Sequence, residues 1–502
     1  MRLTRIEIDG YKHLKKIKFD AGNTDREKLP VYFLAGLNGT GKSAFLEAVA
    51  LIFSRISQNE LPGFAFKVSY EMVVEGKIVS VTVRPEENRK LGRLHIEAGN
   101  EVLHSFEDHE KYLPYKIFVC VSGQNSQMRQ LVLDAAKDSI FSDIYDAGIE
   151  EQPEGIGQLV RYLEELQQNP RVLYLDEQIA GLVLFVLCAW RPREGSDYTK
   201  LRAKLLRKLS NGFYPKILSV TAEKDRIETP LFSELMCTKG EAEKQGNLQL
   251  ASWVSEDAGR ITAAYCITGE DGRFCSEQIA KRYVSPLTLL INLLQAKNSG
   301  EMQECHVLYQ REKGSDLLTE RALSDGELLW IGRMGLILLA RQMEADNCLF
   351  LLDEPDVHLN ESWNIDFVSY LQELTALPES REGMHHNFLV TTHSSLLLTD
   401  APRNHIFLFG RKNGEIQVRQ VPISLFAASR NEISQNMFQT NAKMGSYASK
   451  QSEEVLRKEE NPEKLAAYIN QMGPGIKRYQ MWDKYFELQE NKNDVPQNNA
   501  GE

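Results

Sequence analysis

The sequence predicts an α/β fold, and three stretches of chain support this prediction. The apolar run 31–35 leads into a glycine-rich segment and then into helical spacing of apolar residues over 43–54. The runs 348–352 and 388–392 have the length and composition of buried strands. Buried parallel strands appear in sequence as nearly unbroken apolar runs. We therefore expect strands that alternate with helices, with the glycine-rich segment at a strand end.

Residues 36–43, here called the glycine loop, fit the phosphate-binding pattern GxxxxGK[ST]. A triphosphate carries several negative charges, and successive backbone N–H groups at a helix N-terminus point into such charge. Lys42 would supply a cation to the β and γ oxygens, and the Ser43 hydroxyl would ligate Mg²⁺. The residues expected to bind the nucleotide here are Asn38, Gly39, Thr40, Gly41, Lys42 and Ser43.

Two carboxylates follow the strand predicted over 348–352. A carboxylate at the end of a buried strand is costly unless it faces a metal, so we expect Asp353 to bind Mg²⁺ beside Ser43. Glu354 points in another direction and is the candidate for polarising an attacking water. The stretch 173–177 has a similar sequence but lacks the following proline.

Two further segments complete the candidate site. His393 follows the strand 388–392, where an imidazole could contact a γ-phosphate and assist catalysis; a capping or core histidine is the alternative. Ser324, Gly326 and Glu327 precede a helix expected over 328–341, which is again an anion-binding geometry.

These four segments, taken in chain order, resemble the Walker A, signature, Walker B and switch-histidine motifs of ATP-binding-cassette (ABC) ATPases. The resemblance implies a P-loop NTPase that hydrolyses ATP with Mg²⁺. It also implies a homodimer in which the signature of one subunit completes the nucleotide site of the other. Gln124 stands where the Q-loop glutamine would bind Mg²⁺, with positions 127 and 130 as alternatives. Lys12 matches a basic position that touches nucleotide in SMC-like heads, unless it is a solvated lysine.

The opening Gly10-Tyr11-Lys12, the stretch 121–125 and the extended motif 353–360 with Trp363 look like the SMC/OLD-like ATPases of bacterial restriction and antiphage systems. Glu361 departs from the proline usual there. We see no acidic cluster for a Toprim nuclease, so the chain resembles the ATPase subunit of Septu-, PARIS- or retron-type systems. That implies a separately encoded effector such as a nuclease, a phage protein or nucleic acid as trigger, and assemblies larger than a dimer.

Two other functions were considered. An SMC-like ATPase acting directly on DNA usually carries a coiled-coil arm with a zinc hook, but the sequence has neither sustained heptads nor a CxxC pair. A transporter cassette would have a much shorter interval between Lys42 and Ser324. We expect an N-terminal head part over 1–130, an inserted mostly helical lobe over 131–300, a second head part over 301–410, a helical region over 411–490 and a disordered tail over 491–502. The lobe should include a β segment near 260–276, with strands over 260–267 and 273–276 around a turn at the glycines 269 and 272.

Composition agrees with a cytoplasmic protein that has no membrane partner. The chain has 502 residues, 42% of them hydrophobic, a formal charge of −11 and seven scattered cysteines. The longest apolar stretch, 182–190, is too short to span a bilayer. Basic residues gather within 191–208, either as a solvated helix face or as a docking patch for nucleic acid or an acidic protein: Arg191, Arg193, Lys200, Arg202, Lys204, Arg207 and Lys208.

Overall fold

A computed structural model shows two units, Met1–Ile433 and Ser434–Glu502. The structure describes residues 1–22, 31–86, 94–103, 109, 111–122, 171–175, 177–191, 196–227, 235–236, 253–283, 285–341, 347–357, 359–375, 386–430, 432–433, 437, 446–473 and 475–493. Each unit is described by itself below.

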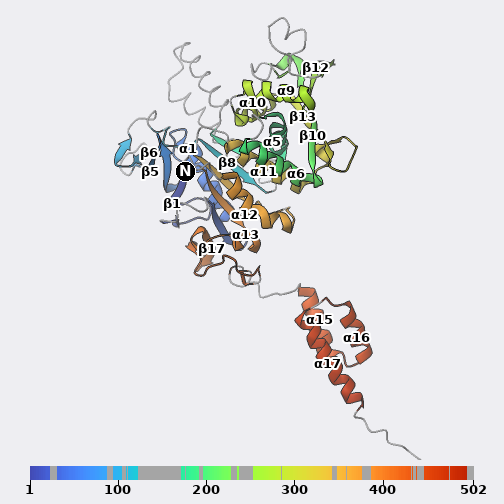
Figure 1. Cartoon of the computed structure of the whole chain (residues 1–502). Helices are drawn as coiled ribbons and strands as arrows, with labels where there is room; N and C mark the ends of the chain where they lie inside the picture. Colours follow the sequence, from blue (N-terminus) through green and yellow to red (C-terminus); the bar gives the residue numbers. More distant parts are fainter. Residues whose placement is uncertain are drawn as a thin grey trace, which may run out of the picture. The chain divides into compact units, whose positions relative to one another are not determined.

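A seven-stranded sheet forms the centre of the first unit (Figure 1), with the strand order β18-β17-β3-β16-β15-β8-β9. All neighbouring strands are parallel except β18, which runs antiparallel to β17 at one edge. The predicted α/β class is confirmed. The strands are β3 (Val31–Gly36), β8 (Lys116–Val121), β9 (Val172–Leu175), β15 (Cys348–Asp353), β16 (His386–Thr392), β17 (Ile406–Lys412) and β18 (Glu415–Gln420).

The central strands are buried along their whole length, as their unbroken apolar runs require. On one face, Phe350 of β15 stacks against Phe118 of β8 and Phe388 of β16, both with ring centroids 4.7 Å away. The register pairs Asp353 with Thr391. The carboxyl ends of β15 and β16 therefore lie side by side.

Helix α1 (Lys42–Ile56) and a six-stranded antiparallel sheet share a core with the other face of the seven-stranded sheet. Side chains such as Phe45, Ile6 and Leu351 belong to this one cluster of buried residues. The strand order is β2-β1-β4-β5-β6-β7, formed by β1 (Arg2–Asp9), β2 (Ile17–Asp20), β4 (Ala65–Val74), β5 (Lys77–Pro85), β6 (Leu94–Ala98) and β7 (Glu101–Leu103). A turn joins β4 to β5, with positive φ angles at Glu75 and Gly76 that suit a two-residue hairpin.

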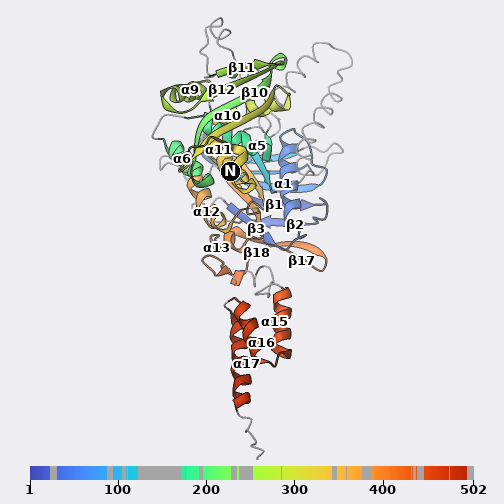
Figure 2. The same ribbon diagram turned by 90° about the vertical axis from the view of Figure 1, so that its right-hand side faces the viewer.

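Four helices, α5 (Glu177–Ala189), α6 (Asp197–Lys208), α11 (Asp325–Arg341) and α12 (Glu361–Thr375), are connected through α11, which contacts the other three. In Figure 2, α11 lies between α5 and α12. Two glycines of α11 allow a close approach to α5: a Cβ on Gly332 would lie 2.6 Å from the Cβ of Ala180, and one on Gly335 would lie 2.6 Å from a methyl of Leu187. The two helices can pack this closely because the residues at positions 332 and 335 are glycines, which have no side chain.

The described part of the expected inserted lobe has more helix than strand, but it contains more β structure than the segment expected near 260–276. Its described part contains a five-stranded antiparallel sheet with the order β11-β12-β10-β13-β14. The missed strand, β10, buries Leu218, Val220 and Ala222 with a period of two, and its Pro215 stands at a register shift, where a strand tolerates proline. The strands are β10 (Phe213–Glu223), β11 (Trp253–Asp257), β12 (Arg260–Cys266), β13 (Met302–Arg311) and β14 (Leu318–Thr319).

One predicted strand in this lobe is wrong. Residues 273–276 belong to helix α9 (Gly269–Arg282), which is followed by α10 (Pro286–Asn298). Cys275, Ile279 and Tyr283 are all buried and lie four residues apart. This spacing places them on one helix face, and it outweighs the turn that the glycines at 269 and 272 suggested.

The predicted domain boundaries also need correction. Strand β9 lies within 131–300 yet completes the seven-stranded sheet, and β13 lies within 301–410 yet pairs with β10 of the lobe. The boundary at 410 falls inside β17, and β18 extends the sheet to Gln420. Sheet pairing joins segments distant in sequence, so boundaries drawn along the chain miss these exchanges.

The second unit contains α15 (Ser446–Lys458), α16 (Pro462–Gln471) and α17 (Ile476–Asn493), which confirms the helices expected in this region. Its core consists of Leu465, Ile469 and Met481, with partly buried apolar residues around them. Residues 494–502 of the expected tail lie outside the described residues. Among the described helices, none is both long and apolar enough to cross a membrane.

The packing of α5 against α11 predicts that alanine stabilises the protein at one glycine and destabilises it at another. Alanine is favoured over glycine in helices by about 1 kcal/mol. Gly181→Ala of α5 should therefore raise the free energy of unfolding, because open space surrounds its Cβ position. Gly332→Ala should lower it by about 1–3 kcal/mol, because overpacking against Ala180 outweighs the propensity gain. Urea denaturation of both variants measures the two changes, and stabilisation by Gly332→Ala would contradict the described packing.

Candidate functional site

The glycine loop connects β3 to α1 and needs its glycines. Gly36, Gly39 and Gly41 have φ angles of 152°, 72° and 92°. A Cβ at Gly36 would lie 2.3 Å from the carbonyl oxygen of Phe409, so no side chain fits there. The loop ends at the N-terminus of α1, where free backbone N–H groups can receive an anion.

Neighbouring side chains shape the loop. Thr40 is buried and its hydroxyl donates to the carbonyl of Leu37 at 2.8 Å, while Asn38 is exposed. From outside the loop, the Arg411 guanidinium of β17 donates to the carbonyl of Gly39 at 2.9 Å. The loop conformation is therefore held by side chains as well as by its glycines.

Lys42 is buried beneath the loop, with 5% of its surface exposed. Its Nζ donates to the carbonyls of Gly36 and Leu37 at 3.0 and 3.2 Å, and lies 2.8 Å from Nε2 of His393. Burial lowers the pKa of Lys42, and the nearby carboxylate of Glu354 acts in the opposite direction. The ammonium is thus already positioned at the centre of the loop.

Asp353 ends β15 beside the start of α1. Its Oδ1 accepts hydrogen bonds from Ser43 Oγ at 3.0 Å and Thr391 Oγ1 at 2.6 Å. Burial raises the pKa of Asp353, and these two hydrogen bonds partly offset that effect. A buried carboxylate next to a hydroxyl is the oxygen donor set that Mg²⁺ takes from a protein when phosphates and water supply the rest. Ser43 and Asp353 therefore fit the expected metal.

Glu354 has a backbone conformation that is rare for a residue with a side chain, with a φ of 47°. Its N–H donates to Thr391 Oγ1 at 2.9 Å, and its carbonyl accepts from Ser122 Oγ. Its carboxylate lies 3.2 Å from Nε2 of His393, and this hydrogen bond is the largest cause of the lowered pKa of Glu354. A strained backbone held by several hydrogen bonds is a common feature of functional sites.

The Nε2 atom of His393 contacts both Lys42 and Glu354. A neutral imidazole can use one nitrogen either to accept from the ammonium or to donate to the carboxylate, but not for both at once. The two contacts therefore compete.

The segment 322–327, here called the Ser324 segment, lies at the N-terminus of α11. Glu327 Oε2 accepts from the N–H and the hydroxyl of Ser324, both at 2.9 Å, which forms a capping box. Its other oxygen accepts from the N–H of Ser210 at 2.7 Å, and Gly326 lies in the first helical turn. Ser324 and Asp325 are exposed while Leu323 is buried, and Glu327 orients Ser324 within its own chain.

The two remaining predicted residues have different outcomes. Lys12 pairs with Glu47 of α1, a carboxylate that also accepts from Tyr11 Oη at 3.3 Å. The side chain of Lys12 therefore contacts α1, and its contact with a nucleotide stays a prediction. Gln124, like its alternatives at 127 and 130, lies outside the described residues.

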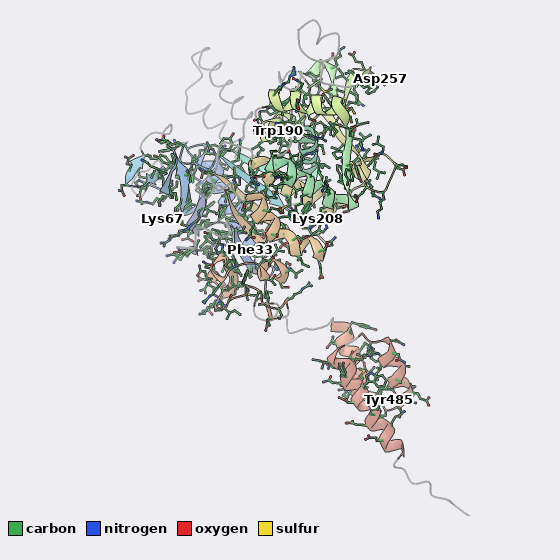
Figure 3. All side chains as sticks on the ribbon, viewed as in Figure 1. Phe33, Lys67, Trp190, Lys208, Asp257 and Tyr485 are labelled. Carbon is green, nitrogen blue, oxygen red and sulfur yellow. The ribbon has the colours of Figure 1, made fainter. Side chains whose placement is uncertain are left out.

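The basic segment on α6 is largely used inside the first unit. Lys204 pairs with Glu373 and Lys208 pairs with Asp366 at 2.5 Å, both carboxylates belonging to α12, while Arg202 is buried and donates to a backbone carbonyl. The Nζ of Lys208, labelled in Figure 3, lies 5.6, 5.5 and 4.8 Å from the ring centroids of Trp330, Trp363 and Tyr370. Lys204 and Lys208 also tie α6 to α12. Lys200, Lys204 and Arg207 are exposed opposite the buried leucines of α6, as expected of a solvated helix face, and docking of nucleic acid or an acidic protein stays a prediction. Arg193 lies outside the described residues.

Several site residues were missed by the sequence reasoning. Thr391 and Asp356 approach the site from β16 and the turn after β15, and burial raises the pKa of Asp356. Ser122 and Arg333 approach from the end of β8 and from α11. Thr391 precedes His393 by two residues and Ser122 lies in the stretch 121–125 noted above, but neither was assigned a role, and no spacing pointed to Arg333.

Comparison with known proteins adds no assignment. No protein-family model matches the sequence, and none of the curated proteins searched is significantly similar to it. The interpretation of the site therefore depends on its own residues and geometry.

The opposite pKa shifts of Asp353 and Glu354 predict opposite effects on stability. The raised pKa of Asp353 means that its ionised form is disfavoured in the folded state, a penalty present above the folded pKa and absent at low pH. Asp353→Asn should therefore raise the melting temperature of the nucleotide-free protein at pH 7, with a gain that disappears as pH falls. The lowered pKa of Glu354 means that Glu354→Gln should lower it at pH 7. Melting curves between pH 4 and pH 8 test this, and equal shifts of one sign would contradict the described electrostatics.

Proposed function

We propose that this chain is a Mg²⁺-dependent ATPase of the ABC type. The observation that supports this most strongly is that the ends of β3, β15 and β16 gather Lys42, Asp353, Glu354 and His393 around one glycine loop. This set contains a cation for phosphate, a carboxylate for metal, a carboxylate for water and an imidazole that contacts two of them. A site with these four parts suits phosphoryl transfer from a nucleoside triphosphate to water.

Each residue has a distinct task in this proposal. The loop N–H groups and Lys42 bind the β and γ phosphates, and Ser43 with Asp353 would hold Mg²⁺, which would supply positive charge beside the phosphates. Glu354 accepts a proton from the attacking water, since its lowered pKa keeps it ionised near neutral pH. His393 senses the γ-phosphate through its contact with Lys42.

We further propose that two chains sandwich two nucleotides. Ser324 stands exposed and Gly326 half-buried at the N-terminus of a 17-residue helix, and the hydroxyl of Ser324 donates to Glu327, which also accepts from the N–H of Ser210. Ser324 would redirect its hydroxyl from Glu327 to the γ-phosphate bound by the opposite subunit. Such a switch exchanges one charge-assisted hydrogen bond for another, so it requires little net energy.

The wider role that we propose is a sensor and scaffold for antiphage defence that controls a separately encoded effector, such as a nuclease. It is supported by the sequence resemblance and by a surface that ATP hydrolysis does not need: Ile476, Tyr479 and Phe486 of α17 are all exposed. The alternative is an SMC-like ATPase that acts directly on DNA. The internal pairing of Lys204 and Lys208 leaves less of the α6 charge for DNA.

Two substitutions separate binding from hydrolysis. Lys42→Ala should abolish ATP binding, because it removes the buried cation at the centre of the loop. Glu354→Gln should bind ATP but hydrolyse it about two to four orders of magnitude more slowly, because a positioned general base is lost. Binding of a fluorescent ATP analogue and phosphate release measure the two steps. Near wild-type hydrolysis by Glu354→Gln would overturn its assignment as the base.

A nucleic-acid assay distinguishes the scaffold from the alternative function. The pure chain should leave plasmid, single-stranded DNA and tRNA intact, with or without ATP, and its ATP turnover should not respond to added DNA. Metal-dependent cleavage that survives Lys42→Ala would reveal a nuclease in this chain. Turnover strongly stimulated by DNA would favour the DNA-acting alternative.

A further inference from the structure

The Arg333 guanidinium is a buried charge next to the acidic turn 353–356. It belongs to α11, and 2% of the residue is exposed. Burial lowers the pKa of Arg333. Burying a guanidinium is costly unless its donors are satisfied, and breaking such an arrangement is more damaging than replacing it whole. The hydrogen-bond partners of Arg333 therefore indicate the role of its charge.

Its two described partners are Pro355, which follows Glu354 in the chain, and Ser122, which donates to the carbonyl of Glu354. One terminal nitrogen donates to the carbonyl of Pro355 at 2.6 Å, and the other donates to Ser122 Oγ at 2.8 Å. Ser122 Oγ in turn donates to the carbonyl of Glu354, and the Ser122 N–H donates to the carbonyl of Asp353 at 3.1 Å. One guanidinium thus holds two consecutive carbonyls of the acidic turn, one directly and one through a hydroxyl.

These contacts act where the backbone is strained. Glu354 has a φ of 47°, a conformation that is costly for a residue with a side chain and persists only where the surroundings impose it. Thr391 holds the N–H of Glu354, while Ser122 and Arg333 hold the carbonyl side. The direction of the Glu354 carboxylate is therefore fixed from both ends of its own residue.

The helix that carries Arg333 begins at the Ser324 segment. Arg333 stands nine positions after Ser324, a distance of about 13–14 Å along a helix that rises about 1.5 Å per residue. A helix is stiff along its axis, so a shift imposed on its N-terminus reaches Arg333. The Ser324 segment faces the opposite subunit in the proposed dimer, and the acidic turn faces this chain's own nucleotide.

We propose that Arg333 is a positioning residue that couples the engagement of Ser324 by the opposite subunit's nucleotide to the geometry of Glu354 in its own chain. This inference rests on the proposed ATPase function and adds the regulation of that site. A nucleotide drawn against the Ser324 segment moves α11, and Arg333 with Ser122 passes the movement to the carbonyls of Pro355 and Glu354. The two sites of the dimer then hydrolyse ATP cooperatively.

Three variants test the coupling. Arg333→Lys keeps the charge but loses the fork that reaches two partners. Arg333→Met removes both. Ser122→Ala removes the hydrogen bond to the Glu354 carbonyl and leaves the Arg333–Pro355 contact in place. The matched control is Arg341→Met on the same helix, whose guanidinium donates to the Glu373 carbonyl at 3.5 Å, away from the acidic turn.

We expect kcat to fall about 10- to 100-fold in Arg333→Met and Ser122→Ala, with partial rescue in Arg333→Lys. The dissociation constant for a fluorescent ATP analogue should stay unchanged, because Lys42 and the loop are untouched. The dependence of rate on ATP concentration should lose its cooperativity. Arg341→Met should keep the kcat and the cooperativity of the wild type.

Wild-type kcat and cooperativity in Ser122→Ala and Arg333→Lys would overturn the inference. Equal losses in kcat, nucleotide affinity and melting temperature would show a purely structural role and would also overturn it. If Arg333→Met fails to fold, Ser122→Ala decides the question. A wild-type protein that does not hydrolyse ATP would instead refute the proposed function, so the two failures are distinguishable.

Discussion

The parallel register of β3, β16 and β15 is the constraint on which the rest of the candidate site depends. It places Thr391 beside Asp353 and Thr392 beside Ala35, so strand ends more than 300 residues apart in sequence share one edge of the sheet. Parallel strands deliver their carboxyl ends to the same edge, where crevices form outside an α/β sheet. The glycine loop, the acidic turn and His393 meet there because the strands are paired in this way.

The gathered charges are only partly compatible with burial. Asp353 and Asp356 have raised pKa values because they are desolvated, and the pKa of Lys42 is lowered for the same reason. Keeping these desolvated groups in the folded protein without a ligand lowers its free energy of unfolding, but the groups are then already in place for binding. Mg²⁺ and a triphosphate would supply the opposite charges that the carboxylates and the ammonium lack. The electrostatics thus give a physical reason to expect binding at this edge.

Much of this could be predicted because the important residues are contiguous with strands. Lys42, Asp353 and His393 each follow an apolar run, and strand ends in parallel sheets converge, so their meeting was predictable. The contacts of Ser122 and Arg333 were not predictable in this way. The stretch 121–125 was noted for its resemblance alone, and Arg333 lies among the apolar residues of α11. Their relation to Glu354 exists only in three dimensions.

The inserted lobe was the least predictable part. Pro215 obscured the alternation of β10, and the glycines at 269 and 272 suggested a turn where α9 begins. In both cases burial decided the structure against the local signal, which is the usual way that tertiary packing overrides propensity. The head was better predicted because local signal and burial agree there.

The central claim is that the nucleotide site is completed by a second chain. The most direct measurement mixes two variants that are each inactive, Lys42→Ala and Ser324→Arg. A mixed dimer has one site with an intact glycine loop from one chain and an intact Ser324 segment from the other. The account predicts that ATP hydrolysis, absent from either variant alone, appears on mixing and depends on the ratio of the two proteins. Its rate should stay about 10- to 100-fold below that of a wild-type site, because the Glu354 at the intact site belongs to the chain whose Ser324 is replaced. Full activity of Ser324→Arg alone, or no recovery at any ratio, would contradict it.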